Sequence, residues 1–410
     1  MDGTSTLNNN RFKIGSMDSR LAAIFLIVLI DVLGLTIILP LLPFYSEHFG
    51  AGAKTVGLLV AVYGACQLVS GPIFGRWSDR YGRKPILLLS QMGTCAGFLV
   101  LAFAPSLKWV FLARIIDGVT AGNISIAQAY IADIAKPQER PKALGKISVA
   151  FGVGFFIGPA LTAVLYHFGY RPPILLAALL SLLSIIATAF LLPQDGSWKK
   201  QPEQQLPSLL SAAITYFRKS SLQANFLRIF LYYISFAAYI AGFALFAERR
   251  FRVAGNPMNA RQVGYAFAYF GLVGIITQLF CIGKMTETLG GRRTAMAGFT
   301  TSFLGYGVLC LVHNPWWILL AGALSSFGSG VLRPVLLSAI AGDVPPQERG
   351  GVIGVTQALQ SFTQIVSPLV STALLASSTL AFWGLFPAMM NVFGLCLMFR
   401  REPENDGASA

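Results

Sequence analysis

The sequence predicts an all-α membrane protein in which twelve transmembrane helices form two six-helix halves. The chain has 410 residues, of which 55% are hydrophobic and only 12% are charged, with a mean hydropathy of +0.64. Soluble proteins average about 25% charged residues. Apolar segments long enough to cross a bilayer recur along the chain. Motifs of the first half return in the second, which indicates two related units.

Twelve apolar segments account for the predicted crossings. The expected spans are 21–44, 56–75, 86–104, 108–132, 144–166, 173–192, 222–247, 262–283, 294–312, 316–341, 352–374 and 380–399. The polar stretch 193–221 holds three prolines and is expected to be a cytoplasmic linker between the halves. The predicted organisation is a disordered tail (1–20), a first half (21–192), this linker, a second half (222–400) and a short tail (401–410).

The basic residues predict the orientation in the membrane. The formal net charge is +14 with a pI near 9.8, and most of the 31 Lys and Arg residues fall in alternate loops and the two tails. Short basic loops stay on the cytoplasmic side, so both termini are expected there. This pattern explains the charge without a nucleic-acid partner. Arg249, Arg250, Arg252 and Arg261 depart from it, because they crowd a loop that is expected to be outside.

The segment Gly75-Arg-Trp-Ser-Asp-Arg-Tyr-Gly-Arg-Lys-Pro85 joins two predicted spans and is expected to be a short cytoplasmic loop. Within it Asp79 is expected to cap the next helical turn, and Arg83 to reach Asp133. Such a cluster would hold an inner gate closed; the alternative is a basic anchor for lipid headgroups. The residues assigned to this gate are Gly75, Asp79, Arg80, Gly82, Arg83 and Asp133.

An internal duplication relates the two halves. Pro137-Gln-Glu-Arg140 recurs as Pro346-Gln-Glu-Arg349, and the same separation relates Gly82-Arg83 to Gly291-Arg292. Several matches at one separation are the mark of a repeat. Arg292 is therefore predicted to be a second gate residue. Asp79 corresponds to Thr288, so the second gate cluster is expected to be weaker.

These motifs resemble the major facilitator superfamily, drug:proton antiporter type, and are most similar to the tetracycline exporter branch. Besides the basic segment, the resemblance rests on Arg114-Ile-Ile-Asp-Gly118, Tyr130-Ile-Ala-Asp133 and Phe246-Ala-Glu-Arg-Arg-Phe251. It covers about residues 20 to 400. It also includes the glycine-rich fifth helix, with Gly152, Gly154, Gly158 and Pro159. Small residues let membrane helices approach closely; the resemblance implies a specific antiport role, and plain tight packing is the alternative.

Asp31 lies about ten residues into the first predicted span, which is about 15 Å at 1.5 Å per residue. A carboxylate there costs about 2.5 kcal/mol or more. Arg114 and Asp117 share one face of the fourth span, and the resemblance implies that helices 1, 4, 7 and 10 line a central cavity. Asp31 is therefore interpreted as the proton carrier, Arg114 as its counter-charge and Asp117 as a second titrating acid. The alternative is a static salt bridge.

Other polar and aromatic residues of the expected cavity helices are candidates for substrate binding. They are Asn123, Gln128, Tyr232, Tyr233, Phe236, Arg333, Gln357 and Gln360. Each alone is more often a packing residue than a ligand contact. Arg333 lies deep in the tenth span, where either an anionic group or a backbone carbonyl would be its partner.

The predicted function is proton-coupled export of a small, moderately hydrophobic drug or metabolite by alternating access, from the cell (inner) membrane. The third and ninth spans lack the acids of tetracycline exporters, so recognition of metal–tetracycline is not implied. Two alternatives stay open: a metabolite symporter or facilitator, and a receptor that resembles a transporter without transporting.

An enzyme is not expected, because the chain has no nucleophile–histidine–acid set and no phosphate-binding loop. No cofactor or metal site is expected either. The five cysteines lie in apolar segments at irregular spacings, which argues against disulfides. The expected partners are the substrate, protons and the bilayer, and the expected assembly is a monomer.

Overall fold

The computed structural model describes residues 17–135, 140–193, 216, 220–345, 348–376 and 380–399, nearly all of them helical. The first half comprises α1 (Met17–His48), α2 (Ala53–Tyr81), α3 (Arg83–Ala102), α4 (Leu107–Val119), α5 (Asn123–Ile134), α6 (Arg140–Leu165), η1 (Tyr166–Phe168) and α7 (Arg171–Leu191). The second comprises α9 (Ser220–Arg250), β1 (Arg252–Val253), β2 (Asn256–Pro257), α10 (Ala260–Ile276), η2 (Thr277–Cys281), α11 (Ile282–Leu311), α12 (Trp317–Gly342), α13 (Arg349–Ala376), η3 (Leu380–Phe382) and α14 (Leu385–Phe399). The predicted linker and both predicted tails lie almost wholly outside these residues.

Twelve crossings follow from the helix lengths. Ten helices of the described residues are long and apolar enough to cross a membrane, and α14 is a shorter apolar helix. One of the ten, Ala260–Leu311, has 52 residues and would be about 78 Å long if straight, far more than the bilayer core of about 30 Å. Non-helical torsion angles at Gly290 divide it into two crossings. The predicted all-α fold with twelve spans is confirmed.

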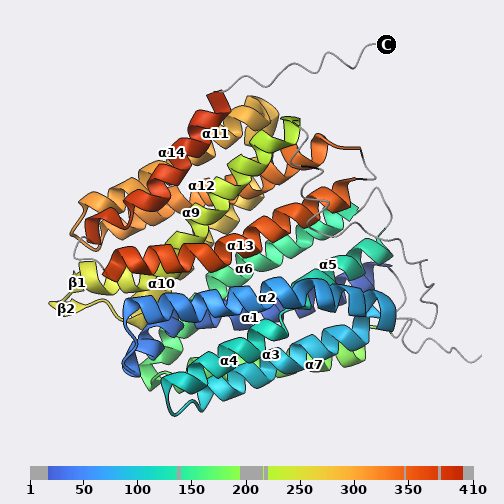
Figure 1. Cartoon of the computed structure of the whole chain (residues 1–410), viewed down its shortest axis with the longest axis horizontal. Helices are drawn as coiled ribbons and strands as arrows, with labels where there is room; N and C mark the ends of the chain where they lie inside the picture. Colours follow the sequence, from blue (N-terminus) through green and yellow to red (C-terminus); the bar gives the residue numbers. More distant parts are fainter. Residues whose placement is uncertain are drawn as a thin grey trace, which may run out of the picture.

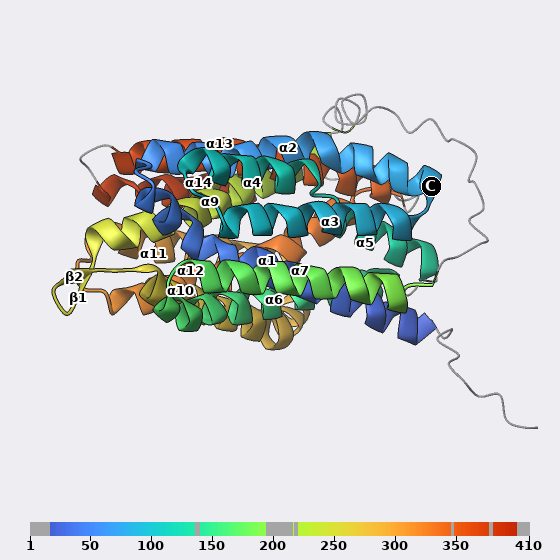
Figure 2. The ribbon, with the colours of Figure 1, turned by 90° about the horizontal axis from the view of Figure 1, so that it is seen from below.

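The helices run side by side along the long axis of the molecule (Figure 1), with the β1–β2 hairpin at one end. We call this end the hairpin end. The opposite end, where α1 begins and α14 ends, is called the tail end (Figures 1 and 2). α4 and α5 together form one of the candidate crossings, Leu107–Ile134.

Apolar packing differs between the two ends. Towards the hairpin end, residues of both halves form one continuous core, in which Tyr45 and Phe98 join Phe243, Phe246 and others. Towards the tail end each half has a core of its own. One gathers around Ile24, Ile27 and Leu87 of the first half, and the other around Phe226, Phe299 and Leu336 of the second half. Among the described residues, the halves are thus joined more tightly at the hairpin end.

Two pairs of helices form the main contact between the halves: α2 against α13, and α6 against α10. Both pairs lie in the middle of the bundle in Figure 1, where α13 runs beside α2. Small residues permit the approach. A Cβ atom on Gly57 of α2 would lie 2.8 Å from the Pro368 carbonyl oxygen, and one on Gly264 of α10 would lie 2.8 Å from the Pro159 carbonyl oxygen.

The segment Gly75–Pro85 is mostly helical, which corrects the predicted loop. α2 continues to Tyr81, α3 begins at Arg83, and only Gly82 lies between them, with φ 96° and ψ 149°. The boundary was misplaced because α2 extends as a polar helix beyond its apolar stretch. Gly82 is the N-cap residue of α3, and Asp79 lies near the end of α2, where it pairs with Arg83; the cap by Asp79 stays a prediction.

In the second half the chain also reverses direction between two helices at a glycine, but one residue earlier than the sequence repeat predicts. Gly290, with φ 77° and ψ 161°, has the conformation of Gly82, whereas the repeat aligned Gly82 with Gly291. Two adjacent glycines left this choice open in the sequence. Residues with side chains strongly disfavour this region of backbone torsion angles.

We expect Gly290→Ala to destabilise the protein by about 1 to 3 kcal/mol. Gly291→Ala is the matched control, because Gly291 has helical torsion angles and a Cβ atom there would lie 4.0 Å from its nearest neighbour, Cγ1 of Val335. Thermal unfolding of both purified variants in detergent measures the difference. Equal melting temperatures would contradict the assignment of the reversal to Gly290.

Candidate functional site

Asp31 lies where four helices of the first half meet. It is on α1, and Nε2 of Gln91 on α3 lies 3.4 Å from its Oδ2 atom. Ser184 of α7 and Asn123 of α5 are also within hydrogen-bonding reach of the carboxyl group. Nε2 of Gln91 also donates to Oγ of Ser184 at 2.7 Å. All these partners are neutral, so polar groups surround Asp31 without supplying a counter-charge.

Two amide oxygens beside Asp31 have no hydrogen-bond donor. Oε1 of Gln91 and Oδ1 of Asn123 are buried and unpaired among the described residues. An ionised carboxylate only accepts hydrogen bonds, whereas a protonated carboxyl group also donates one. The amide nitrogens therefore suit the ionised form of Asp31, and the free amide oxygens are acceptors for the protonated form. The surroundings of Asp31 are matched to both protonation states.

Arg114 does not pair with Asp31. Its Nη1 atom lies 2.8 Å from Oδ2 of Asp117, in a pair buried on both sides, and its guanidinium carbon lies 4.1 Å from the centre of the Tyr63 ring. The expectation that Arg114 is the counter-charge of Asp31 is therefore corrected. Asp117 is three residues away on the same helix and is the closer acid. The sequence showed this spacing but did not show which acid the arginine prefers.

Helix α3 lies between the two acids. Gln91 reaches Asp31, and Thr94, one helical turn later, is within hydrogen-bonding reach of Asp117. The helix without acidic residues thus supplies a neutral polar contact to each acid. Gln91 and Ser184 were not predicted as site residues, although polar residues within apolar spans were a signal for them.

The basic segment forms a compact cluster at the tail end. Arg83 forms ion pairs with Asp79 and with Asp133, the latter at 2.8 Å, and it donates to Oγ of Ser78 at 2.7 Å. The structure therefore brings together the three charged residues expected to meet. They join α2, α3 and α5, which all belong to the first half, so the cluster does not itself connect the two halves.

The remaining predicted gate residues lie outside this cluster. Gly75 accepts a hydrogen bond from Ser78 through its carbonyl oxygen, and Arg80 is exposed beside the Tyr81 ring. Arg292 donates twice to the carbonyl oxygen of Met398, at 3.0 and 2.6 Å. Among the described residues, Arg292 of the second half thus bonds to a backbone carbonyl oxygen, whereas Arg83, its counterpart in the first half, pairs with two carboxylates.

The predicted antiporter helix, α6, is packed between α1 and α10. A Cβ atom on Gly154 would lie 2.5 Å from Val32, and one on Gly158 would lie 2.0 Å from Oγ1 of Thr36. The same Thr36 hydroxyl donates to the carbonyl oxygen of Gly154 at 2.9 Å. Gly152 faces the other way, towards Ile275 of α10. These glycines bring α1 and α6 into backbone contact one residue away from Asp31.

Several predicted substrate residues gather in the second half. Tyr232 and Tyr233 of α9 are buried, and the Tyr232 ring stacks on Phe236 with centroids 5.9 Å apart. The Arg333 guanidinium carbon lies 5.9 Å from the centre of the Phe151 ring of α6. The others are spread: Asn123 belongs to the Asp31 site, Gln128 is half-buried on α5, and α13 carries an exposed Gln357 and a half-buried Gln360.

An ion pair that was not predicted connects the halves at the hairpin end. Nη2 of Arg249, at the end of α9, lies 3.1 Å from Oε1 of Glu47 at the end of α1. Nη1 of Arg249 donates to the carbonyl oxygen of Leu375 in α13 at 3.0 Å. The neighbouring Arg250 donates to the carbonyl oxygen of Val312. Structural contacts thus explain why arginines crowd a loop expected to be outside.

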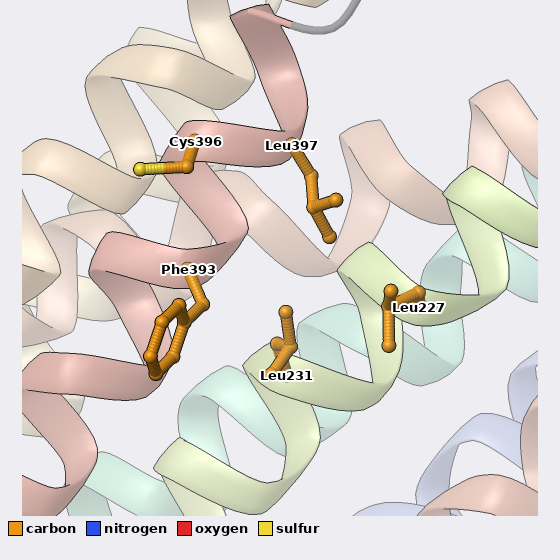
Figure 3. A pocket seen from close by; sticks show the side chains of 5 residues that line it. All are labelled: Leu227, Leu231, Phe393, Cys396 and Leu397. Atoms are coloured by element: carbon orange, nitrogen blue, oxygen red, sulfur yellow. The ribbon is translucent and has the colours of Figure 1, made fainter.

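The groove in Figure 3 is separate from these residues. It holds about 520 Å³ between α9 and α14 and is lined by Leu227, Leu231, Phe393, Cys396 and Leu397. Its lining is apolar, and none of the predicted substrate residues contributes to it. In a bilayer, such a surface suits a lipid acyl chain.

We expect Gly271→Ala to weaken the contact between α6 and α10. Its Cβ atom would lie 2.3 Å from the Phe155 carbonyl oxygen, whereas a Cβ atom on Gly274 of the same helix would meet nothing within 4 Å. Overpacking of this kind costs about 1 to 3 kcal/mol. Thermal unfolding should separate Gly271→Ala from the control Gly274→Ala. A Gly271→Ala variant as stable as its control would rule out this backbone contact.

Comparison with known proteins gives consistent relatives. The family model of the Major Facilitator Superfamily matches residues 24–255 and 230–410. The chain is 29% identical to the tetracycline resistance protein, class C, of Escherichia coli over 87% of this chain and 90% of that protein. It is 27% identical to multidrug resistance protein 2 of Bacillus subtilis (strain 168), over 94% and 97%. The crystal structure of the human organic anion transporter MFSD10 (TETRAN) has a TM-score of 0.71 at 23% identity, covering 93% of this chain and 99% of that one.

Proposed function

Because the chain belongs to the Major Facilitator Superfamily and is a membrane transporter rather than an enzyme, we propose that it exports a small, moderately hydrophobic organic molecule in exchange for protons. Relatives named for tetracycline and multidrug resistance support export. The observation that carries proton coupling is Asp31, which lies within the membrane among neutral amides that suit both of its protonation states.

The proton site works by exchange of hydrogen-bond partners. An ionised Asp31 without a counter-charge is costly in a membrane, and uptake of a proton removes this cost. The amide groups of Gln91 and Asn123 limit the penalty when the proton leaves. Asp117 is held by Arg114 at 2.8 Å and is assigned a structural role. We therefore propose Asp31 as the proton carrier and a structural role for the Arg114–Asp117 pair, which fixes α4.

The direction of opening follows from the packing of the two ends. We assign the tail end to the cytoplasm, in keeping with the basic residues around it. With one joint core at the hairpin end and separate cores at the tail end, this conformation has its outer side closed. The Glu47–Arg249 pair stabilises that closure, and the Arg83 cluster serves the opposite gate when the halves rock.

We expect Asp31→Asn to abolish proton-driven transport, because an amide cannot exchange a proton, while substrate binding persists. The measurement is uptake of a fluorescent aromatic compound into inverted vesicles under an imposed pH gradient. Ser184→Ala is the control, since it removes a neutral neighbour of Asp31 and keeps the carboxyl group. Uphill uptake by Asp31→Asn at the wild-type rate would remove Asp31 from the coupling mechanism.

We expect Glu47→Gln and Arg249→Gln to loosen the hairpin end, because each removes one charge of the pair that joins the halves. The measurement is the rate at which a membrane-impermeant maleimide labels an Ala244→Cys variant, after the five native cysteines are replaced by serine. Ala244 is buried in the joint core, so faster labelling reports opening.

Two further variants test the same pair. The charge-reversed double variant, Glu47→Arg with Arg249→Glu, should restore slow labelling. Arg252→Gln should have no effect, because Arg252 donates to the Glu248 carbonyl oxygen within its own half. Unchanged labelling in both single variants would show that the pair does not hold the outer gate.

A further inference from the structure

Arg333 is an arginine at mid-membrane depth. It lies on α12, nine residues before the end of that helix at Gly342, or about 14 Å at 1.5 Å per residue. Asp31 lies eleven residues from Arg20, where the first span begins, or about 16 Å from the same side of the membrane. Charged side chains at this depth are costly and normally have a partner or a functional role.

No carboxylate of its own half is placed to neutralise Arg333. Between residues 222 and 399 the only acids are Glu248 at the hairpin end and Glu287, Asp343 and Glu348 at the tail end. In the first half, Asp117 pairs with Arg114, and Asp31 has only neutral partners. Within the described part of the chain, Arg333 therefore forms no ion pair.

Arg228 shows how a buried arginine of this half is satisfied when its role is structural. Its Nη2 atom donates to the Leu397 carbonyl oxygen at 2.8 Å, and its Nη1 atom donates to Oδ1 of Asn225 at 2.6 Å. Arg333 has different surroundings. It is half-buried, the Tyr233 hydroxyl is within hydrogen-bonding reach, and the Phe151 ring of the other half lies 5.9 Å away.

Aromatic rings surround this unpaired charge at the boundary between the halves. Tyr232 stacks on Phe236, Tyr233 adjoins Arg333, and Phe151 comes from α6, next to Gly152 of the predicted antiporter helix. A guanidinium group binds carboxylates and related anions through paired hydrogen bonds, and the half-buried rings of Phe236 and Phe151 offer apolar surface to a flat molecule. A lipid headgroup is not expected at this depth, because headgroups lie outside the hydrocarbon core.

We propose that Arg333 is the anion subsite of the substrate site, and that the exported molecule carries an acidic group attached to a planar aromatic body. This inference rests on the proposed export function and names its substrate class. The acidic group binds the guanidinium of Arg333, and the ring lies against the half-buried Phe236 and Phe151. Because Phe151 belongs to the other half, the subsite changes its surroundings when the halves rock.

The test compares three probes that share one ring system: 2-naphthoate, 2-naphthamide and (2-naphthylmethyl)trimethylammonium. Isothermal titration calorimetry of the full chain in detergent at pH 7.5 measures their dissociation constants. We expect the wild type to bind naphthoate at least about tenfold more tightly than naphthamide, as a hydrogen-bonded charge pair implies. Arg333→Gln should lose this preference, whereas Arg333→Lys should keep part of it.

Arg261→Gln is the matched control, because it removes one positive charge from an exposed arginine far along the chain from α12 and should leave the preference unchanged. If Arg333→Gln fails to fold, the ratio of the naphthamide and naphthoate dissociation constants still tests the anion subsite. It is then compared between the wild type and Arg333→Lys. Equal affinities of the wild type for naphthoate and naphthamide, or an undiminished preference in Arg333→Gln, would overturn the anion subsite. These measurements use no proton gradient, so they are independent of whether proton-driven export itself is found.

Discussion

The cost of placing a carboxyl group inside a membrane governs this structure. Asp31 is accommodated by amide and hydroxyl groups from three other helices, α3, α5 and α7, so a single side chain brings together most of the first half. Neutral amides stabilise a carboxylate less than an arginine would, but their oxygen atoms can also accept a hydrogen bond from the protonated carboxyl group. A salt bridge at this place would hold one charge state firmly. The amides can instead form hydrogen bonds to either state, which suits the role of proton carrier that we propose for Asp31.

The sequence predicted the fold more fully than the site. Apolar segments and the internal repeat were sufficient for twelve spans in two related halves, and the resemblance of several motifs implied the facilitator fold. The places where prediction failed have physical causes. The length of an apolar stretch does not show where a helix ends in water. The predicted second span therefore stopped before the polar last turns of α2. A pair of adjacent glycines does not show which one adopts a positive φ angle, so the second reversal was placed one residue late.

Contacts between helices were less accessible to sequence reasoning. The contact of Arg83 with Asp79 and Asp133 could be predicted from sequence motifs, because the residues of a motif lie in fixed relation to one another. The choice of Arg114 between two acids depends on distances across helices, which no spacing along one helix provides. The Glu47–Arg249 pair joins residues at the ends of two distant helices. Only the excess of arginine on the unexpected side indicated that something there needed positive charge.

The backbone contact between α1 and α6 has a mechanical consequence. Gly154 and Gly158 present no side chains to α1, and Thr36 donates to the backbone of α6, so only the short side chains of Val32 and Thr36 lie between the two helices at these positions. They are thus constrained to tilt as one rigid body. Since α6 also forms half of the seam with α10, a displacement of the seam moves the Asp31 carboxyl group relative to water on either side. Under the proposed role of Asp31 as proton carrier, geometry alone then decides which compartment exchanges protons with it, without a separate relay of side chains.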